Sequence, residues 1–439
     1  MIPGITEILL SIFYAVFFII VLKKVTFFKL PGLHPNLVSV IFMVKIFAGV
    51  VLTQIYTRYY PPEKADTFLY YEDAKIIYRT LPDHPEVFMQ IISGIGTSNE
   101  ETKKQIDSMN NWYRNEFDPL PNDNRTLTRI NALMMLFSFG YYYVHIIFMC
   151  FLSLTGLTGL YRFFLSCTGV HPAFLAFTVF LFPSVIFWSS GILKEGLLFF
   201  GAGSFLFAAY RILKKITISS SLLIAAGLSI LLFNKIYFFA ILLPFLILLF
   251  WTGKSGYQNL TVKFMVVALS FTACVYVAQL IFPGFNLVNL IAFKRKDLIN
   301  LAITGHAGSL ITTDIPEISL LWIIKEIPAS LFTAIFRPHF LDCKNIFMTI
   351  SFLENMMILV FILLPVFFYR PFTGNQNKVY FLAFFSFSIV LLTIAGITTP
   401  VLGALVRYRV PALPFLMVSL LIITDTDKII SKVKKLFGR

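Results

Sequence analysis

Long apolar runs separated by short polar segments dominate the sequence. A helix that crosses a membrane needs about 20 mostly apolar residues, and marking such runs predicts eleven membrane spans. Their ranges are 4–22, 34–56, 131–154, 171–190, 192–210, 219–233, 236–252, 260–282, 346–369, 379–397 and 410–424. Glycines and prolines inside several runs are compatible with spanning helices, because neighbouring helices can satisfy the backbone groups that they free. The pattern predicts an all-α polytopic transmembrane helical bundle.

The composition agrees with this fold class. The chain has 439 residues, 58% of them hydrophobic and only 13% charged, whereas soluble domains carry about 25% charged residues. A soluble globule, a disordered chain and a small disulfide scaffold are therefore excluded. The four cysteines lie far apart and show no spacing typical of a zinc site, so no metal site is predicted. His145 and His171 are interpreted as structural histidines.

Basic residues predict the orientation of the chain in the membrane. Lys and Arg number 36 against 22 Asp and Glu, a net charge of +14. Many of them fall on alternate connections, and the positive-inside rule assigns those connections to the cytoplasm. They are Lys23, Lys24, Lys29, Arg162, Arg211, Lys214, Lys215, Lys254, Arg370, Lys378, Lys428, Lys432, Lys434, Lys435 and Arg439. The prediction is a protein of the plasma (inner) membrane with an outside N-terminus, a cytoplasmic C-terminus and a basic cytoplasmic tail over 425–439.

Two long connections are predicted on the extracytoplasmic side, at 57–130 and 283–345. Within the first, the segment 101–117 places Ile106, Met109 and Tyr113 on one helical face, which predicts a helix along the membrane surface. Within the second, the semi-apolar stretch 318–336 is predicted to be interfacial or re-entrant. The chain is interpreted as one integral membrane domain, 1–439. Because the cytoplasmic connections are short, any chemistry is expected at the extracytoplasmic face.

Acidic residues near the ends of spans are candidates for catalysis, because a charge at mid-membrane costs about 2.5–3.5 kcal/mol. Asp66 follows the second span and is suited to act as a general base. Its spacing before an amphipathic helix favours a role as the helix N-cap, and the two roles are compatible. Lys194 and Glu195 open the predicted span 192–210 after a tight Ser-Gly turn. Glu195 is a second candidate acid there, and the alternative is a local Lys–Glu pair that stabilises the turn.

Basic residues on the predicted outer side are candidates for binding an anion. Arg407 and Arg409 lie where the outer loop enters the last span, against the positive-inside bias. The planar guanidinium group matches phosphate oxygens and stays charged when partly desolvated. The alternative is that both side chains extend to the lipid headgroups. Lys235, in a short outer turn, and Arg337 are further candidates.

Three short motifs, in this order, resemble the GT-C-fold polytopic glycosyltransferases of the protein mannosyltransferase and aminoarabinose transferase group. An Asp-x3-Tyr-x3-Ala pattern opens a helix in the first outer loop, a short outer turn combines proline, serine and glutamate, and a basic–aromatic–basic run precedes spaced prolines. The matching residues are Asp66, Tyr70 and Ala74; Pro183, Ser189 or Ser190, and Glu195; and Arg407, Tyr408, Arg409, Pro411 and Pro414.

The resemblance implies a cell-envelope transferase that moves a sugar from a polyprenyl-phosphate-linked donor to an acceptor glycan, lipid or protein. Its partners would be these substrates and membrane lipids, not nucleic acid. The family often has two adjacent acids in its first loop, whereas Asp66 follows Lys64 and Ala65 without a neighbouring acid, which leaves a need for a divalent metal open. The resemblance implies a role for each candidate residue. Asp66 would be the general base, and Glu195 would be the acid that orients acceptor or donor. The donor phosphate would bind Arg407, Arg409, Lys235 and Arg337, and the substrate would be lined by Tyr70, Lys194 and Tyr408.

Other functions compete with this interpretation. A polysaccharide polymerase or ligase acting on lipid-diphosphate-linked glycans would depend on outer arginines, such as Arg337 or Arg407, more than on Asp66. A transporter or flippase would place charged residues along a pathway through the spans, and a structural subunit would need none of the residues named above. The transferase hypothesis expects Asp66 and Glu195 to line one outer-facing cavity, with Arg407 or Arg409 within reach.

Overall fold

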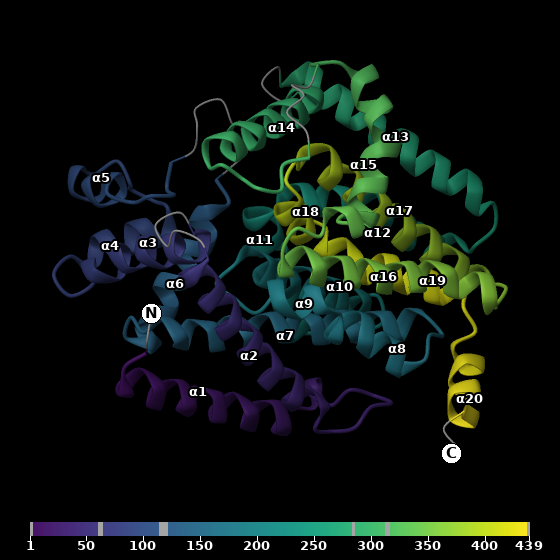
Figure 1. Cartoon of the computed structure of the whole chain (residues 1–439), viewed down its shortest axis with the longest axis horizontal. Coiled ribbons are helices and arrows are strands. Elements are labelled where there is room, and N and C mark those ends of the chain that lie inside the picture. The colour runs from purple at the N-terminus through teal and green to yellow at the C-terminus, as the bar shows by residue number, and fades with distance from the viewer. Residues whose placement is uncertain (1–2, 60–64, 114–121, 283–285, 312–316, 437–439) are drawn as a thin grey trace. The chain divides into compact units, whose positions relative to one another are not determined.

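The computed structural model describes residues 3–59, 65–113, 122–282, 286–311 and 317–436 (Figure 1). Within these residues every named element is a helix, and the only β-structure consists of two isolated bridges. The predicted all-helical fold class is therefore confirmed. The chain divides into two compact units, Met1–Phe163 with Val179–Ile236, and Phe164–Thr178 with Tyr237–Arg439.

The first unit combines long apolar helices with the shorter helices of the first predicted outer loop. Its α3 packs extensively on α6, and its α10 packs extensively on α11. The helices of this unit are α1 (Ile5–Lys24), α2 (Leu37–Arg58), α3 (Asp66–Thr80), α4 (Pro85–Ser93), α5 (Glu100–Asp107), α6 (Asn124–Ser138), most of α7 (Tyr142–Cys167), α9 (Pro183–Trp188), α10 (Lys194–Ile212) and α11 (Ile218–Asn234).

Glycines allow three helices of the first unit to approach closely. A Cβ atom added to Gly203 of α10 would overlap the backbone carbonyl of Gly156 in α7, and one added to Gly159 would lie 2.6 Å from the Gly203 oxygen. On the other side of α10, a Cβ on Gly227 of α11 would lie 2.8 Å from the Gly201 oxygen. Small residues at such contacts let helix backbones meet and gain packing energy in a membrane.

The second unit is built around α17, which packs against α14, α15 and α19. Its core is strongly aromatic; the rings of Phe387 and Phe415 lie 4.7 Å apart, edge to face. The helices of this unit are α8 (Pro172–Ala176), α12 (Ile236–Ser255), α13 (Leu260–Ile281), α14 (Leu287–Thr304), α15 (Leu320–Phe336), α16 (Ile346–Phe367), α17 (Asn375–Thr398), α18 (Leu402–Tyr408), α19 (Leu413–Ile422) and α20 (Thr426–Leu436).

Eight helices in the described residues are long and apolar enough to cross a membrane. These segments are 5–24, 37–58, 142–167, 236–255, 260–281, 346–367, 375–398 and 402–422. Each corresponds to a predicted span, although 131–154 is divided: α6 ends at Ser138, Phe139 adopts a φ of +53°, and α7 starts at Tyr142. The structure supports a membrane protein with eight candidate spans, fewer than the eleven expected.

Three predicted spans, at 171–190, 192–210 and 219–233, are not among the eight. The first consists of α8, a π-helical turn over Phe177–Leu181, and α9, because Pro183 cannot continue the preceding helix. The other two are α10 and α11, of 19 and 17 residues. An even number of spans would place both termini on the same side, so the predicted orientation depends on these three segments.

The helix in the first predicted outer loop is shorter than predicted, and the stretch predicted to be interfacial or re-entrant in the second is one continuous helix. The helix expected over 101–117 is α5, which ends at Asp107, and residues 114–117 lie outside the described part of the chain. The stretch 318–336 forms one helix, α15, with Pro328 inside it.

In the first loop the buried Asp73 carboxylate accepts the backbone N–H groups of Asn110 and Asn111, both at 2.8 Å.

Candidate functional site

A cluster of charged side chains lies at one end of the first unit. The Asp123 carboxylate contacts two ammonium groups: Oδ1 lies 2.7 Å from Lys194 Nζ, and Oδ2 lies 2.8 Å from Lys235 Nζ. The side chains of Asp123, Lys194 and Lys235 are only 11%, 9% and 18% exposed. Water therefore screens these charges weakly, and both ammonium groups are held close together.

The ends of three helices bring this cluster together. Asp123 immediately precedes α6, Lys194 is the first residue of α10, and Lys235 directly follows α11. The Asn234 side chain donates a hydrogen bond to the Lys194 carbonyl oxygen at 3.0 Å. The start of α10 and the end of α11 thus lie at the same carboxylate, so the two helices form an antiparallel hairpin. We call Asp123, Lys194 and Lys235 the Asp123 cluster.

Helix α3 adds Asp66 and Tyr70 to the surroundings of the cluster. Lys194 Nζ lies 5.6 Å from the centre of the Tyr70 ring, and the Tyr70 hydroxyl donates to Asn124 Oδ1 at 3.2 Å. The half-buried Asp66 carboxylate acts electrostatically on the Lys194 ammonium. Three predicted site residues, Asp66, Tyr70 and Lys235, thus each lie near a fourth, Lys194.

The positions of Asp66 and Glu195 refine two predictions. The N-cap of α3 is Ala65, so Asp66 is the first helical residue and not the cap; its charge there is favoured by the positive end of the helix dipole. Glu195 lies in the first turn of α10, as predicted, and is buried. Lys194 pairs with Asp123, so the local Lys–Glu alternative does not describe its closest ion pair.

The environment makes Lys194 a proton donor of unusual acidity. Lys194 belongs to none of the eight candidate spans. Burial lowers the pKa of its ammonium below the ordinary range, and the charge of Lys235 lowers it further. The carboxylates of Asp123 and Asp66 partly offset this shift. An ammonium group of this kind can both stabilise an anion and release a proton to it.

Asp123 and Lys45 were not among the residues predicted from the sequence. Asp123 lies in a polar run, Pro-Asn-Asp-Asn-Arg, with no motif of its own. A signal was nevertheless present, since two lysines at predicted outer turns near apolar spans need a counter-charge. Lys45 is a charge inside an apolar run, which is a functional candidate by default.

Lys45 supports the turn that precedes the cluster. Its fully buried Nζ donates to the Ser189 hydroxyl at 2.5 Å and to the Ser189 carbonyl oxygen at 3.2 Å. Ser189 directly follows α9, and Lys194 begins α10 five positions later. The contact joins α2 to the turn and thereby helps to fix the start of α10.

The predicted arginines lie in the second unit and have protein partners. Arg409 is fully buried, and its guanidinium donates to the carbonyl oxygens of Ala334 and Arg337, at 3.1 and 3.2 Å, and to Asn355 Oδ1 at 2.6 Å. Arg407 is also buried, and Tyr408 is half-buried. The contacts of Arg409 join α15, α16 and the segment after α18. Binding of a phosphate by Arg409 stays a prediction and would require these bonds to break.

Arg337 forms a two-point ion pair with Asp342. Its Nε and Nη2 atoms donate to the Asp342 oxygens at 2.9 and 2.5 Å, and the His339 backbone N–H donates to the same carboxylate at 2.9 Å. These hydrogen bonds stabilise the short turn between α15 and α16. Arg337 is thus occupied by a carboxylate of its own turn, and its assignment as a phosphate ligand stays a prediction.

The Arg337–Asp342 pair predicts an acid-sensitive contribution to stability. The guanidinium lowers the pKa of the Asp342 carboxyl, so the stabilisation is complete above the unfolded-state pKa of about 3.9 and is lost as the pH falls through the lower folded-state value. We expect Asp342→Asn to cost about 1–3 kcal/mol at neutral pH. The measurement is the thermal midpoint in detergent across a pH series.

The matched control for this prediction is Asp297→Asn, because Asp297 is 50% exposed and makes only a local 3.5 Å pair with Lys294. We expect the free energy of unfolding of that variant to lie within about 0.5 kcal/mol of the wild-type value. Equal effects of the two substitutions at neutral pH would contradict the assignment of stability to the Arg337–Asp342 pair.

One group with metal-ligand spacing exists among the described residues. His84, Glu86 and Glu101, on and next to α4 and α5, hold one possible ligand atom each within 4.8 Å of one another, and all three are exposed. The two carboxylates lie beside different ring nitrogens of His84, at 3.4 and 3.1 Å. Exposed acidic groups of this kind are common without a metal, so these contacts alone do not assign a metal site.

Of the nine predicted site residues, five belong to the first unit: Asp66, Tyr70, Lys194, Glu195 and Lys235. The other four belong to the second unit: Arg337, Arg407, Tyr408 and Arg409. The expected convergence of Asp66 with an arginine stays a prediction. Comparison of the chain with models of protein families, with curated proteins and with solved structures finds no match in any of the three. The candidate site is therefore interpreted from its own geometry.

Proposed function

We propose that the chain is a membrane glycosyltransferase that uses a polyprenyl-phosphate-linked sugar and acts at the extracytoplasmic face. The observation that carries this proposal is the Asp123 cluster, in which two poorly exposed ammonium groups are held side by side near the carboxylate of Asp66. Paired cations of this kind suit a phosphate group, and a nearby carboxylate suits an acceptor hydroxyl. The long apolar helices supply the environment that a lipid-linked donor needs.

The proposed reaction assigns a role to each group. The acceptor hydroxyl oxygen forms a bond to the anomeric carbon of the sugar while the bond from that carbon to the phosphate oxygen breaks. Asp66 takes the hydroxyl proton, and the bonding electron pair leaves with the phosphate. Lys194 and Lys235 stabilise the negative charge that develops on the leaving phosphate. Asp123 holds the two lysines at the required spacing and is a positioning residue.

A transfer assay with defined polyprenyl-phosphate sugars tests the proposal. The purified chain is placed in nanodiscs, and sugar transfer is compared between the wild type and Asp66→Asn. General base catalysis contributes about 10²–10⁴-fold, so we expect the variant to lose activity by this factor with little change in stability. The control is Glu72→Gln on the same helix, because Glu72 is 48% exposed and forms only a 3.9 Å pair with Lys75.

Two outcomes would contradict the proposed function. The first is full transfer activity of the Asp66→Asn variant, which would show that Asp66 is not the general base. The second is transfer only from lipid-diphosphate-linked glycans, with greater sensitivity to Arg407→Gln than to Asp66→Asn. That second result would favour the polymerase or ligase alternative.

A further inference from the structure

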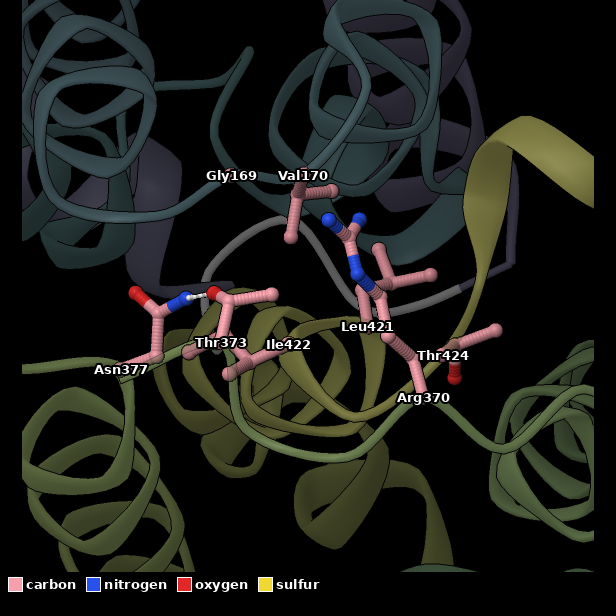
Figure 2. A pocket seen from close by; sticks show the side chains of 8 residues that line it. All are labelled: Gly169, Val170, Arg370, Thr373, Asn377, Leu421, Ile422 and Thr424. Atoms are coloured by element: carbon pink, nitrogen blue, oxygen red, sulfur yellow. Dashed lines mark hydrogen bonds between the residues drawn. The ribbon is translucent and has the colours of Figure 1, made fainter. Parts of the chain in front are cut away.

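A small polar cavity lies at one end of the second unit (Figure 2). Its volume is about 20 Å³. Figure 2 shows the Arg370 side chain extending toward the segment that carries Gly169 and Val170, and Asn377 donating to the Thr373 hydroxyl at 2.7 Å. The remaining lining residues are Leu421, Ile422 and Thr424.

The cavity is formed where several candidate spans end. Gly169 follows α7, Arg370 follows α16, Asn377 lies in the first turn of α17, and Thr424 follows α19. The sequence predicts all of these connections on the cytoplasmic side. Their meeting at one cavity agrees with their predicted common side, and it places the cavity at the level where spanning helices leave the hydrocarbon.

Helix α20 begins directly beside this cavity. The backbone of Arg370 donates to Ile423, and that of Asp425 donates to Phe368, at 2.9 and 2.8 Å, so the start of the tail is tied to the connection between α16 and α17. Lys432 Nζ lies 5.0 Å from the centre of the Phe368 ring. Only a few residues separate α20 from the end of α19 at Ile422, which keeps α20 close to the membrane surface.

The two faces of α20 differ in chemistry. Lys428, Lys432 and Lys435 follow one another at helical spacing and are exposed, whereas Ile429, Ile430 and Val433 gather on another side of the helix. Val433 is 45% exposed. A short basic helix with an exposed apolar face is suited to lie in the interface of an anionic membrane.

The size of the cavity restricts its ligand. About 20 Å³ holds one water molecule or one oxygen atom, but not a whole metabolite. A ligand must therefore insert one polar atom and keep its body outside, next to α20. A phosphodiester headgroup has this shape, with oxygen atoms for Arg370 and acyl chains that stay in the bilayer. Its charge is complementary to the lysines of α20.

We propose that the Arg370 cavity and helix α20 together bind the headgroup of an anionic phospholipid. Arg370 contacts one phosphate oxygen at the cavity, and the lysines of α20 attract the charge of the surrounding leaflet. Asp427 opposes this binding, because its Oδ2 lies 4.0 Å from Arg370 Nη1 and it is 69% exposed. The proposal is independent of the Asp123 cluster and of the proposed transferase function.

Lipid retention by the full chain tests this proposal. The protein is reconstituted in nanodiscs of phosphatidylcholine with phosphatidylglycerol, transferred to detergent, and its bound phosphatidylglycerol is counted by native mass spectrometry. A basic residue near an anionic surface is worth about 5-fold in affinity. We expect Arg370→Gln to lower retention by roughly 5-fold, the combined Lys428→Gln, Lys432→Gln and Lys435→Gln variant to lower it further, and Asp427→Asn to raise it.

The control variant is Lys254→Gln, which removes one positive charge from another predicted cytoplasmic connection, away from the residues that line the cavity, and should lower retention less than Arg370→Gln does. Arg370→Lys keeps the charge and should restore most of the binding, which separates lipid recognition from a folding defect. Equal loss with Lys254→Gln would overturn the proposal, as would retention that Arg370→Gln leaves unchanged. Displacement of the lipid by inorganic phosphate at equal concentration would also overturn it, since the site would then recognise a free anion.

Discussion

Replacement of Asp123 by alanine is expected to destabilise the first unit by about 3–5 kcal/mol and to abolish the proposed sugar transfer. Removing one partner of a buried ion pair leaves its other charge uncompensated, and this cost exceeds the value of the intact pair. Here the loss leaves two ammonium groups without their shared carboxylate, 9% and 18% exposed. Thermal unfolding in detergent and transfer in nanodiscs measure the two effects.

A control substitution and a double-mutant cycle separate the effect of losing the ion pair from the effect of removing an aspartate side chain. The control is Asp83→Ala, because Asp83 is exposed just after α3, and a change of about 0.5 kcal/mol or less is expected there. In a double-mutant cycle with Lys194→Met, the effect of Asp123→Ala should become smaller, since one of the two stranded charges is gone. Additive effects of the two substitutions would contradict the ion pair as the cause.

Replacement of Gly203 by leucine is expected to prevent the first unit from folding. A Cβ at this position overlaps the backbone carbonyl of Gly156, and backbone cannot move aside as the end of a flexible side chain can. Overpacking in cores costs about 1–3 kcal/mol and occasionally more, and here the added atoms would have to separate α7 from α10. Gly203→Ala should lower the thermal midpoint, and Gly203→Leu should yield little monodisperse protein.

Gly253 provides the matched control for this prediction. It also lies inside a helix, α12, but a Cβ there would meet no atom within 4 Å. Gly253→Ala is therefore expected to be neutral or stabilising by about 1 kcal/mol, the difference in helix propensity between the two residues. If Gly203→Ala matched Gly253→Ala in stability, close contact between α7 and α10 would not be a source of stability.

The helical class and eight candidate spans could be predicted from the sequence because hydrophobicity along the chain is a local property. The segment 171–190 could not be placed in the same way, since Pro183 and a π-helical turn divide an apolar run that reads as continuous. Composition records how apolar a run is. It does not record how its backbone hydrogen bonds are interrupted.

The candidate site was predictable only in part for a related reason. Lys194 and Lys235 stood out because charges beside apolar spans are costly, and Asp66 stood out by a short motif. Asp123 lies among other polar residues, where a carboxylate has nothing to distinguish it. Its role arises from tertiary packing, which brings the start of α6 to the ends of α10 and α11.

The short length of α11 has a consequence for the lipid around it. Its 17 residues would extend roughly 25 Å, less than the bilayer hydrocarbon thickness of about 30 Å. If α11 crosses the bilayer, the leaflets must thin locally or flanking polar groups must reach outward to compensate for this mismatch. Thinning would draw lipid headgroups inward toward Lys235, so that the helix length itself would set the depth at which an amphiphile meets the protein.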